Sequence, residues 1–349
     1  MAAKPLPLST LRDTLDAYER HQRSRQNAAA ELGLSVPTFE SRLKAARVAE
    51  QLGRLAPKPF DIPELPNTHI DIDELIAQRL KKFSQKATAK DARKLIPVRI
   101  KETGPFGVAI FGDPHVDDDG TDLRTLKAHL DIVARTPGLV CGQIGDVNNN
   151  WDGRLMKLWA EQSTSADEAW GLAEWFLRSV TWLFWVKGNH DAWSQSRDPI
   201  QRLAQELDVL YDNQVRIALT TPKGREIRIN ARHDFRGHSM WNSAHGVSKA
   251  AQMGWRDHVL VCGHTHQSGY QHLRDPMTRL ISHAIRVGSY KTFDRYADQL
   301  GLPDQTVTVC PVIVFQPQYA DDDPRLITVF NDPEVGADFL TFLRKRKAA

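Results

Sequence analysis

The chain has 349 residues, of which 41% are hydrophobic and 26% are charged. This length predicts a large domain accompanied by a smaller one. A net charge of +3 is too small to indicate nucleic-acid binding by itself, so only local clusters of charge can argue for it. The three cysteines form no CxxC pair, which argues against a disulfide framework or a zinc finger and fits a reducing compartment.

Residues 9–53 are predicted to be helical. Ser9 or Thr10 is placed to cap a first helix, because apolar residues recur at helical spacing after them. A second helix is expected to end at Gly33, since glycine readily adopts the positive φ of a helix C-terminus. Ser35 is then expected to cap a third helix.

A linker and a basic helix are predicted next. Four prolines between residues 55 and 67 indicate an extended linker. Residues 71–94 have an apolar stripe at helical spacing and become strongly basic. The basic residues are Arg79, Lys81, Lys82, Lys86, Lys90, Arg93 and Lys94. Such a cluster favours nucleic-acid binding through counterion release, but a solvated helix face explains it equally well.

After Gly104 the pattern changes to short apolar strands that alternate with amphipathic helices, which is typical of an α/β fold. Helices are predicted over residues 122–135 and 165–180. Strands are predicted at residues 108–111, 139–141, 183–186, 227–231 and 259–262. Polar clusters follow these strands, and open α/β sheets bind their ligands at the C-terminal ends of the strands.

The polar clusters contain groups that bind metals. They are Asp113-Pro-His115, Gly145-Asp146, Gly188-Asn189-His190-Asp191, His233 and Gly263-His264-Thr265-His266. Mixed carboxylate, imidazole and amide groups suit Mn²⁺, Fe or Zn²⁺, and this many ligands suits two ions. Each cluster alone would more often be a turn or a helix cap, so the prediction depends on the whole group. A pair of metal ions is a common means of hydrolysing phosphate esters.

The motif order DxH, GD, GNHD, H and GHxH resembles the calcineurin-like metallophosphoesterase superfamily over about residues 104–320. The resemblance implies a four-layer α/β/β/α sandwich. It implies one metal bound by Asp113, His115 and His266, a second bound by Asn189, His233 and His264, and Asp146 bridging both. It also implies that His190 faces the substrate and assists the leaving oxygen, with Asp191 holding its imidazole. His238 is the alternative to His233.

The motifs also differ from one branch of this superfamily. Ser/Thr protein phosphatases carry GDxVDRG and GNHE, whereas this chain has Gly145-Asp-Val-Asn-Asn-Asn150 and GNHD. The arginine that would bind a phosphomonoester is therefore missing. Because SbcD-type nucleases and many phosphodiesterases share GNHD, a diester substrate is favoured. Asn149, which replaces the aspartate of the phosphatases, is expected either to contact the substrate or to cap a helix.

Residues 28–43 resemble a helix-turn-helix of the Fis or resolvase kind. Ala29 would allow close helix crossing, Gly33 would make the turn, and Phe39 would anchor the second helix. Such a second helix commonly lies in the DNA major groove. The candidate DNA contacts are Thr38, Ser41, Arg42 and Lys44, with Arg47 as a phosphate contact. A tight helical pair without DNA affinity has the same features, and Glu40 on this face argues mildly against DNA.

Together these predictions give four regions: a helix-turn-helix-like domain (1–54), a Pro-rich linker and basic helix (55–103), a metallophosphoesterase domain (104–320) and a C-terminal extension with a basic tail (321–349). The expected function is hydrolysis of phosphodiesters, with two divalent ions, Mn²⁺ before Fe or Zn²⁺, and with DNA as substrate. The alternatives are a small-molecule or cyclic-nucleotide phosphodiesterase, and a DNA-binding regulator with a vestigial metal site.

Without a signal peptide or an apolar run of membrane-spanning length, we expect a cytoplasmic protein of a bacterium or phage-infected cell, with no membrane partner. The sequence is compatible with a homodimer and does not decide the oligomeric state.

Overall fold

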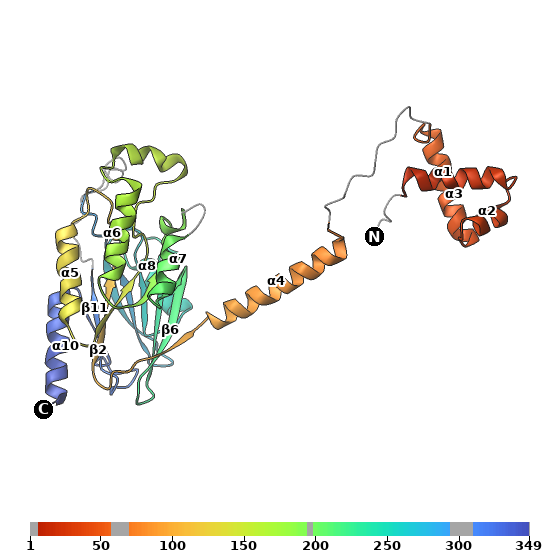
Figure 1. Cartoon of the computed structure of the whole chain (residues 1–349). Coiled ribbons are helices and arrows are strands. Elements are labelled where there is room, and N and C mark those ends of the chain that lie inside the picture. Colours follow the sequence, from red (N-terminus) through yellow and green to blue (C-terminus); the bar gives the residue numbers. More distant parts are fainter. Residues whose placement is uncertain (1–5, 57–69, 194–197, 294–309, 349) are drawn as a thin grey trace. The chain divides into compact units, whose positions relative to one another are not determined.

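The computed structural model describes residues 6–56, 70–193, 198–293 and 310–348. The chain divides into two compact units, Met1–Ala77 and Gln78–Ala349 (Figure 1). The prolines of the predicted linker, at positions 57, 59, 63 and 66, lie outside the described residues. Within the described ranges, every helix is too short or too polar to cross a membrane.

The first unit contains three packed helices, α1 (Leu8–Arg20), α2 (Arg25–Glu31) and α3 (Val36–Gln51). Their shared core consists of Ala17, Tyr18, Ala28, Ala29, Phe39 and Leu43. As predicted, Gly33 has a positive φ of 64°, and the Ser35 side chain accepts a hydrogen bond from the Thr38 N–H. The predicted cap at Ser9 or Thr10 is wrong, because α1 already begins at Leu8 and both residues fall within its first turn.

Helix α4 (Ile72–Ala92) follows, close to its predicted bounds. The apolar stripe predicted for it is present but none of its residues is buried. Leu80 and Phe83, for example, are 62% and 71% exposed. The helix is therefore not held by a hydrophobic core of its own.

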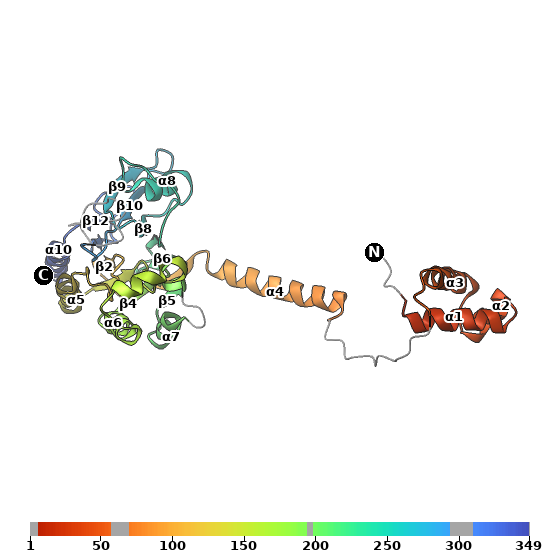
Figure 2. The same cartoon turned by 90° about the horizontal axis from the view of Figure 1, so that it is seen from above.

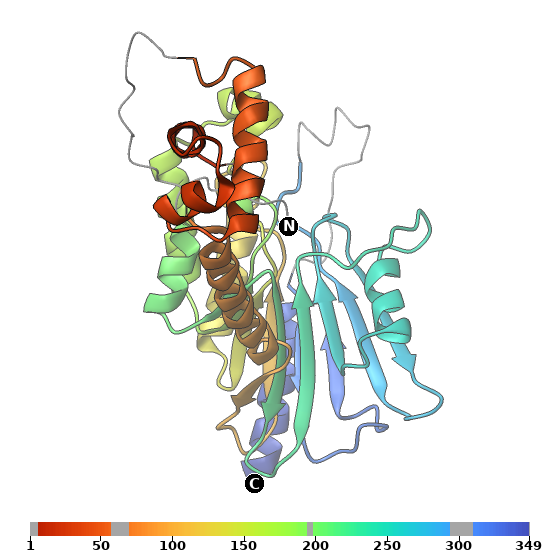
Figure 3. The same cartoon turned by 90° about the vertical axis from the view of Figure 1, so that its right-hand side faces the viewer.

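The second unit is built on two six-stranded sheets (Figure 3). Sheet A has the order β1-β6-β7-β8-β10-β9 and sheet B the order β12-β11-β2-β3-β4-β5. The strands of sheet A are β1 (Ile96–Arg99), β6 (Gln214–Thr220), β7 (Glu226–Arg232), β8 (Val259–Cys262), β9 (Gly269–Arg274) and β10 (Ile281–Arg286). Those of sheet B are β2 (Phe106–Phe111), β3 (Leu139–Gln143), β4 (Trp182–Val186), β5 (Leu210–Asp212), β11 (Val312–Phe315) and β12 (Ile327–Phe330). The five predicted strands are confirmed as β2, β3, β4, β7 and β8.

Helices cover the outer faces of both sheets (Figure 2). Sheet B is covered by α5 (Leu123–Arg135), α6 (Ala166–Arg178), α7 (Pro199–Glu206) and α10 (Pro333–Ala348), and sheet A by α8 (His245–Met253). The central strand β2 is buried on both faces, because Ala109 and Phe111 face the helices and Val108 and Ile110 face the other sheet. Strands buried on both faces are continuously apolar. The predicted four-layer α/β/β/α sandwich is confirmed.

Two predicted boundaries need correction. Strand β1, placed by the sequence in the linker region, pairs in parallel with β6 at the edge of sheet A. Strand β12, placed in a C-terminal extension, pairs with β11 in sheet B, and α10 packs beside α5. Short strands at sheet edges bury few side chains and so leave a weak sequence pattern.

Candidate metal centre

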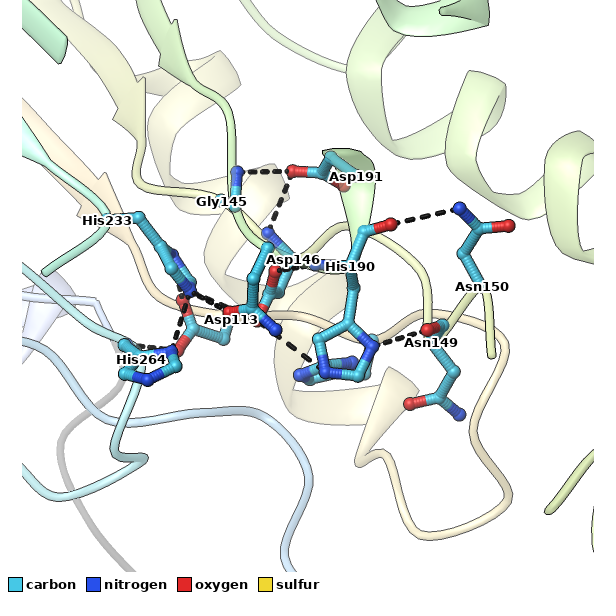
Figure 4. Close-up of polar contacts among 12 residues, drawn as sticks. Asp113, Gly145, Asp146, Asn149, Asn150, His190, Asp191, His233 and His264 are labelled. Atoms are coloured by element: carbon cyan, nitrogen blue, oxygen red, sulfur yellow. Dashed lines mark hydrogen bonds and ion pairs between the residues drawn. The ribbon is translucent and has the colours of Figure 1, made fainter. Parts of the chain in front are cut away.

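The loops that follow β2, β3, β4, β7 and β8 bring the predicted ligands together at the C-terminal ends of these strands (Figure 4). Among the described residues, two groups of side chains are close enough to share an ion. One consists of Asp146, His233 and His264, and the other of His115, Asp146 and His190, with all their ligand atoms within 4.8 Å of one another. Asp146 belongs to both groups, which is the position expected of a bridging carboxylate.

His233 is the centre of the first group. Its Nε2 atom lies 3.1 Å from Asp146 Oδ2, 3.0 Å from His264 Nδ1 and 2.9 Å from Asn189 Oδ1. Its Nδ1 atom lies 2.8 Å from the carbonyl oxygen of Ile144, which is an acceptor only. Nδ1 therefore carries a proton, and Nε2 faces the group, as in histidines that bind metals.

The first and last motifs also lie together beside these groups. His115 Nε2 lies 3.2 Å from His266 Nε2, which in turn lies 3.8 Å from Asp113 Oδ2. The same Asp113 oxygen accepts a hydrogen bond of 2.6 Å from the His264 N–H. The structure thus brings together all seven side chains that the resemblance assigned to the two metals.

This donor set fits divalent cations. Asp113 Oδ1 and His115 Nδ1 are buried and have no hydrogen-bond partner among the described residues. Burial raises the pKa of Asp113 well above its usual value. Burial opposes protonation of His233, yet the carboxylates of Asp146 and Asp113 raise its pKa to about 10. Buried carboxylates require positive charge nearby, and oxygen and imidazole donors suit Mn²⁺, Fe or Zn²⁺.

The backbone of the site is strained at four of the predicted ligands. His115, Asp146, His264 and His266 have positive φ values of 40°, 54°, 71° and 59°, although none is glycine. Each such conformation costs about 1–3 kcal/mol, and these conformations cluster at functional sites. The surrounding sandwich therefore stabilises an arrangement that the loops would not adopt alone.

Glycines make room for this arrangement. Gly145 has a φ of 113°, so it allows the turn after β3. Gly188 has a different role, because a Cβ atom there would lie 2.1 Å from Asp146 Oδ1. The structure therefore requires the absence of a side chain at this position.

His190 belongs to the second group and lies beside the first. Its ring centroid is 5.0 Å from that of His115, and its Nε2 atom is 3.9 Å from Asp146 Oδ2. Its Nδ1 atom is hydrogen-bonded to the carbonyl oxygen of Asn149. This bond fixes the proton on Nδ1 and directs Nε2 toward the site.

Asp191 does not hold the His190 imidazole as predicted. Its carboxylate accepts hydrogen bonds from the N–H groups of Asp146 (2.9 Å), Val147 (3.1 Å) and Gly188 (2.8 Å). Burial, followed by the charge of Asp146, raises the pKa of Asp191 to about 7. Asp191 therefore positions the loops that carry the metal ligands, while a backbone carbonyl orients the histidine.

Asn149 also differs from its prediction as a substrate contact. Its side chain is buried, and Nδ2 donates to Asp118 Oδ2 at 2.6 Å and to Gln162 Oε1 at 3.2 Å. The residue acts on the site through its carbonyl oxygen, which accepts from His190. It does not cap a helix either, since the following helical segment starts at Gly153.

Arg286 is a site residue that the sequence analysis missed. Its buried guanidinium donates to the carbonyl oxygen of Gly263 (2.6 Å), to Thr265 Oγ1 (3.0 Å) and to Asp234 Oδ1 (2.9 Å). It thereby joins the loop of His233 to the loop of His264. An arginine at the end of an apolar strand was the available signal. Lys291, buried 2.8 Å from Asp118 Oδ2, was missed as well.

The candidate DNA contacts lie on α3. Thr38, Ser41, Lys44 and Arg47 are exposed, and Arg42 is half-buried. The Arg47 guanidinium lies over the Tyr18 ring, 5.4 Å from its centroid. Glu40, which argued against DNA, forms a 2.8 Å ion pair with Arg25. Its negative charge is thus partly neutralised.

No protein-family model and no curated protein matches this chain. Solved structures similar to it include Chaetomium thermophilum Vps29, with 14% identity, a TM-score of 0.33, and coverage of 64% of this chain and 96% of that one. Another is the calcineurin-like phosphoesterase YfkN from Bacillus subtilis, with 10% identity, a TM-score of 0.34, and coverage of 69% and 99%. A third is the Haemophilus influenzae NAD nucleotidase NadN, with 9% identity, a TM-score of 0.34, and coverage of 65% and 49%. Similarities this low carry no information on activity.

Proposed function

We propose that this chain is a metal-dependent phosphoesterase of the calcineurin-like superfamily that hydrolyses phosphodiester bonds in DNA. The observation that carries the proposal is the convergence of five separate motifs on Asp146. Its carboxylate lies within reach of imidazoles from four other loops, those of His115, His190, His233 and His264. Oxygen and nitrogen ligands around one shared carboxylate suit two divalent ions, with Mn²⁺ as our choice.

In this proposal Asp113, His115 and His266 hold one ion, Asn189, His233 and His264 the other, and Asp146 both. When bound, such ions lower the pKa of water and neutralise charge on the phosphate. His190 donates a proton from Nε2 to the leaving oxygen, with its ring held by Asn149. Asp191 and Arg286 keep the ligand-bearing loops in place. These two residues support the geometry and do not touch the substrate.

DNA as the substrate is supported by the first unit. Its helices α2 and α3 are joined by a tight turn at Gly33, and α3 exposes hydroxyl and basic side chains. The absence of the phosphatase arginine after Asn149 favours a diester over a monoester. A two-unit chain of this kind would deliver a hydrolytic site to DNA.

The first test is Mn²⁺-dependent cleavage of linear and circular DNA, run beside bis(p-nitrophenyl) phosphate. Wild-type protein is compared with Asp146→Asn and His190→Ala. Cleavage of both substrates by the wild type alone supports the proposal. Cleavage of the aryl diester alone would support the catalytic assignment and would indicate that the substrate is a small diester instead of DNA. Failure on both substrates, together with no Mn²⁺-dependent rise in thermal midpoint, overturns the proposal in favour of a regulator.

A further inference from the structure

Helix α4 carries a line of basic side chains that the catalytic proposal does not use. Arg79, Lys82, Lys86 and Lys90 follow one another at intervals of three and four residues, so they lie on one face of the helix. All four are exposed. We call this set the basic ridge. At 1.5 Å per residue it extends over about 16 Å.

The basic ridge is electrostatically unfavourable within the helix. Lys82, Lys86 and Lys90 are successive i, i+4 neighbours, and like charges at this spacing destabilise a helix. No position three or four residues from any of these lysines holds a carboxylate. Two cations farther along are different, because Arg93 pairs with Asp212 (2.9 Å) and Lys94 with Asp91 (2.6 Å). The helix thus offers the basic ridge little neutralising charge, because Asp91, which lies next to Lys90, is paired with Lys94.

The rest of the helix indicates which polyanion the ridge fits. A helix that lies on an anionic membrane needs large apolar residues along the face opposite its basic side chains. The second half of α4, Ser84–Ala92, contains no large apolar residue. Its large apolar side chains are confined to the first half, where Ile72, Ile76 and Phe83 are exposed. A rigid, closely spaced array of phosphates fits the ridge better than a lipid surface does.

We propose that the basic ridge of α4 binds the phosphate backbone of duplex DNA, without reading its sequence. Each cation that contacts a phosphate releases counterions, so the affinity falls steeply with salt. The ridge acts separately from the candidate contacts on α3 and from the metal centre. Like the proposed function, this proposal depends on DNA as the partner, but it does not depend on hydrolysis.

The test measures the salt dependence of binding by the full chain. A fluorescein-labelled 30-base-pair duplex of arbitrary sequence is titrated with protein at several NaCl concentrations, in EDTA so that no cleavage occurs. The triple variant Lys82→Gln/Lys86→Gln/Lys90→Gln removes three ridge charges. The control Lys223→Gln/Lys249→Gln/Lys345→Gln removes three exposed charges elsewhere. Circular dichroism checks that both variants keep the helix content of the wild type.

We expect the slope of log Kd against log [NaCl] to decrease by about 2.7 in the ridge variant, three phosphate contacts at about 0.9 each, and to stay unchanged in the control. Equal slopes in the two variants, or no binding by the wild type, would overturn the proposal. So would binding to phosphatidylserine vesicles that is lost in the ridge variant while DNA binding is unaffected. A smaller slope in the ridge variant than in the control, without any Mn²⁺-dependent cleavage by the wild type, would uphold the ridge and refute the nuclease.

Discussion

The carboxylate of Asp191 accepts a hydrogen bond of 2.9 Å from the backbone N–H of Asp146. The two acidic residues are 45 positions apart in sequence and belong to the loops after β4 and β3. Because Asp191 also binds the N–H groups of Val147 and Gly188, it fixes the loop of the shared carboxylate against the loop of His190. An acidic residue next to His190, the proposed proton donor, thus binds backbone N–H groups.

Replacing Asp191 should therefore disturb metal binding more than proton transfer. In Asp191→Ala three buried N–H groups lose their acceptor, and an unmade buried hydrogen bond costs about 1–3 kcal/mol. We expect a lower thermal midpoint and weaker Mn²⁺ binding, measured by calorimetry. The control is Asp131→Ala, whose ion pair with Lys127 lies on the surface and contributes little. Unchanged Mn²⁺ affinity in Asp191→Ala would show that the loop holds its shape without it.

The metal content of a His190 variant distinguishes a proton donor from a metal ligand. If it is the proton donor, His190→Ala should lower kcat by about 10²–10⁴-fold, the usual contribution of a general acid. It should leave the number of Mn²⁺ ions per chain unchanged. Because Nε2 faces Asp146 and the His115 ring, a loss of one ion would instead identify His190 as a ligand. Metal analysis of dialysed protein distinguishes the two roles.

His233 and His238 offer a matched pair of substitutions. His233→Ala removes a nitrogen that lies within about 3 Å of three other predicted ligands. His238 is exposed in the following loop. We expect His233→Ala to weaken Mn²⁺ binding by more than about 100-fold, since even an outer partner of a ligand contributes about 10–100-fold. His238→Ala should bind Mn²⁺ as the wild type does, and the reverse result would transfer the ligand role.

A second pair tests the crowding at Gly188. Alanine there would place its Cβ atom 2.1 Å from Asp146 Oδ1, so the carboxylate must move. We expect Gly188→Ala to lose about 1–3 kcal/mol of stability, as overpacked sites do, and to lose activity. Gly171→Ala, in α6, meets no atom within 4 Å and should gain about 0.5–1 kcal/mol from helix propensity. Urea denaturation compares the two.

Acid stability should depend on His283, which lies in β10 and is not one of the predicted metal ligands. Burial, aided by the nearby His272 and His258, lowers the pKa of His283 to about 3 from 6.5. Between these values the unfolded chain binds the proton and the folded chain does not, so stability falls as the pH drops below 6.5. At pH 5 this residue would account for a loss of about 2 kcal/mol relative to neutral pH.

The variant His283→Asn keeps a polar partner for the Tyr270 hydroxyl, which lies 2.7 Å from His283 Nδ1. Its free energy of unfolding should vary less with pH than that of the wild type between pH 7 and 5. Parallel curves for the two proteins would assign the acid sensitivity to other groups. Urea denaturation at a series of pH values provides the comparison.

Features that depend on local sequence could be predicted, whereas features that depend on contacts between distant residues could not. The five central strands and the motifs that follow them were predicted because buried strands are apolar throughout and each motif is local in sequence. The roles of Asp191 and Asn149 were not, because both depend on where distant backbone N–H and carbonyl groups point. Arg286 was missed for the same reason, as it joins two loops that precede it by more than 20 and 50 positions.

The pairing of β1 with β6 has a practical consequence for producing the catalytic unit alone. A fragment that starts at the predicted boundary, Gly104, would lack Ile96–Arg99 and would leave β6 as an open edge of sheet A. Unpaired N–H and C=O groups along an open edge are a template for association with other chains. Ile96 and Val98 also pack against the core between the sheets, so their removal would expose apolar surface. Aggregation of such a fragment would then result from the missing strand, and fragments that begin before Ile96 should stay in solution.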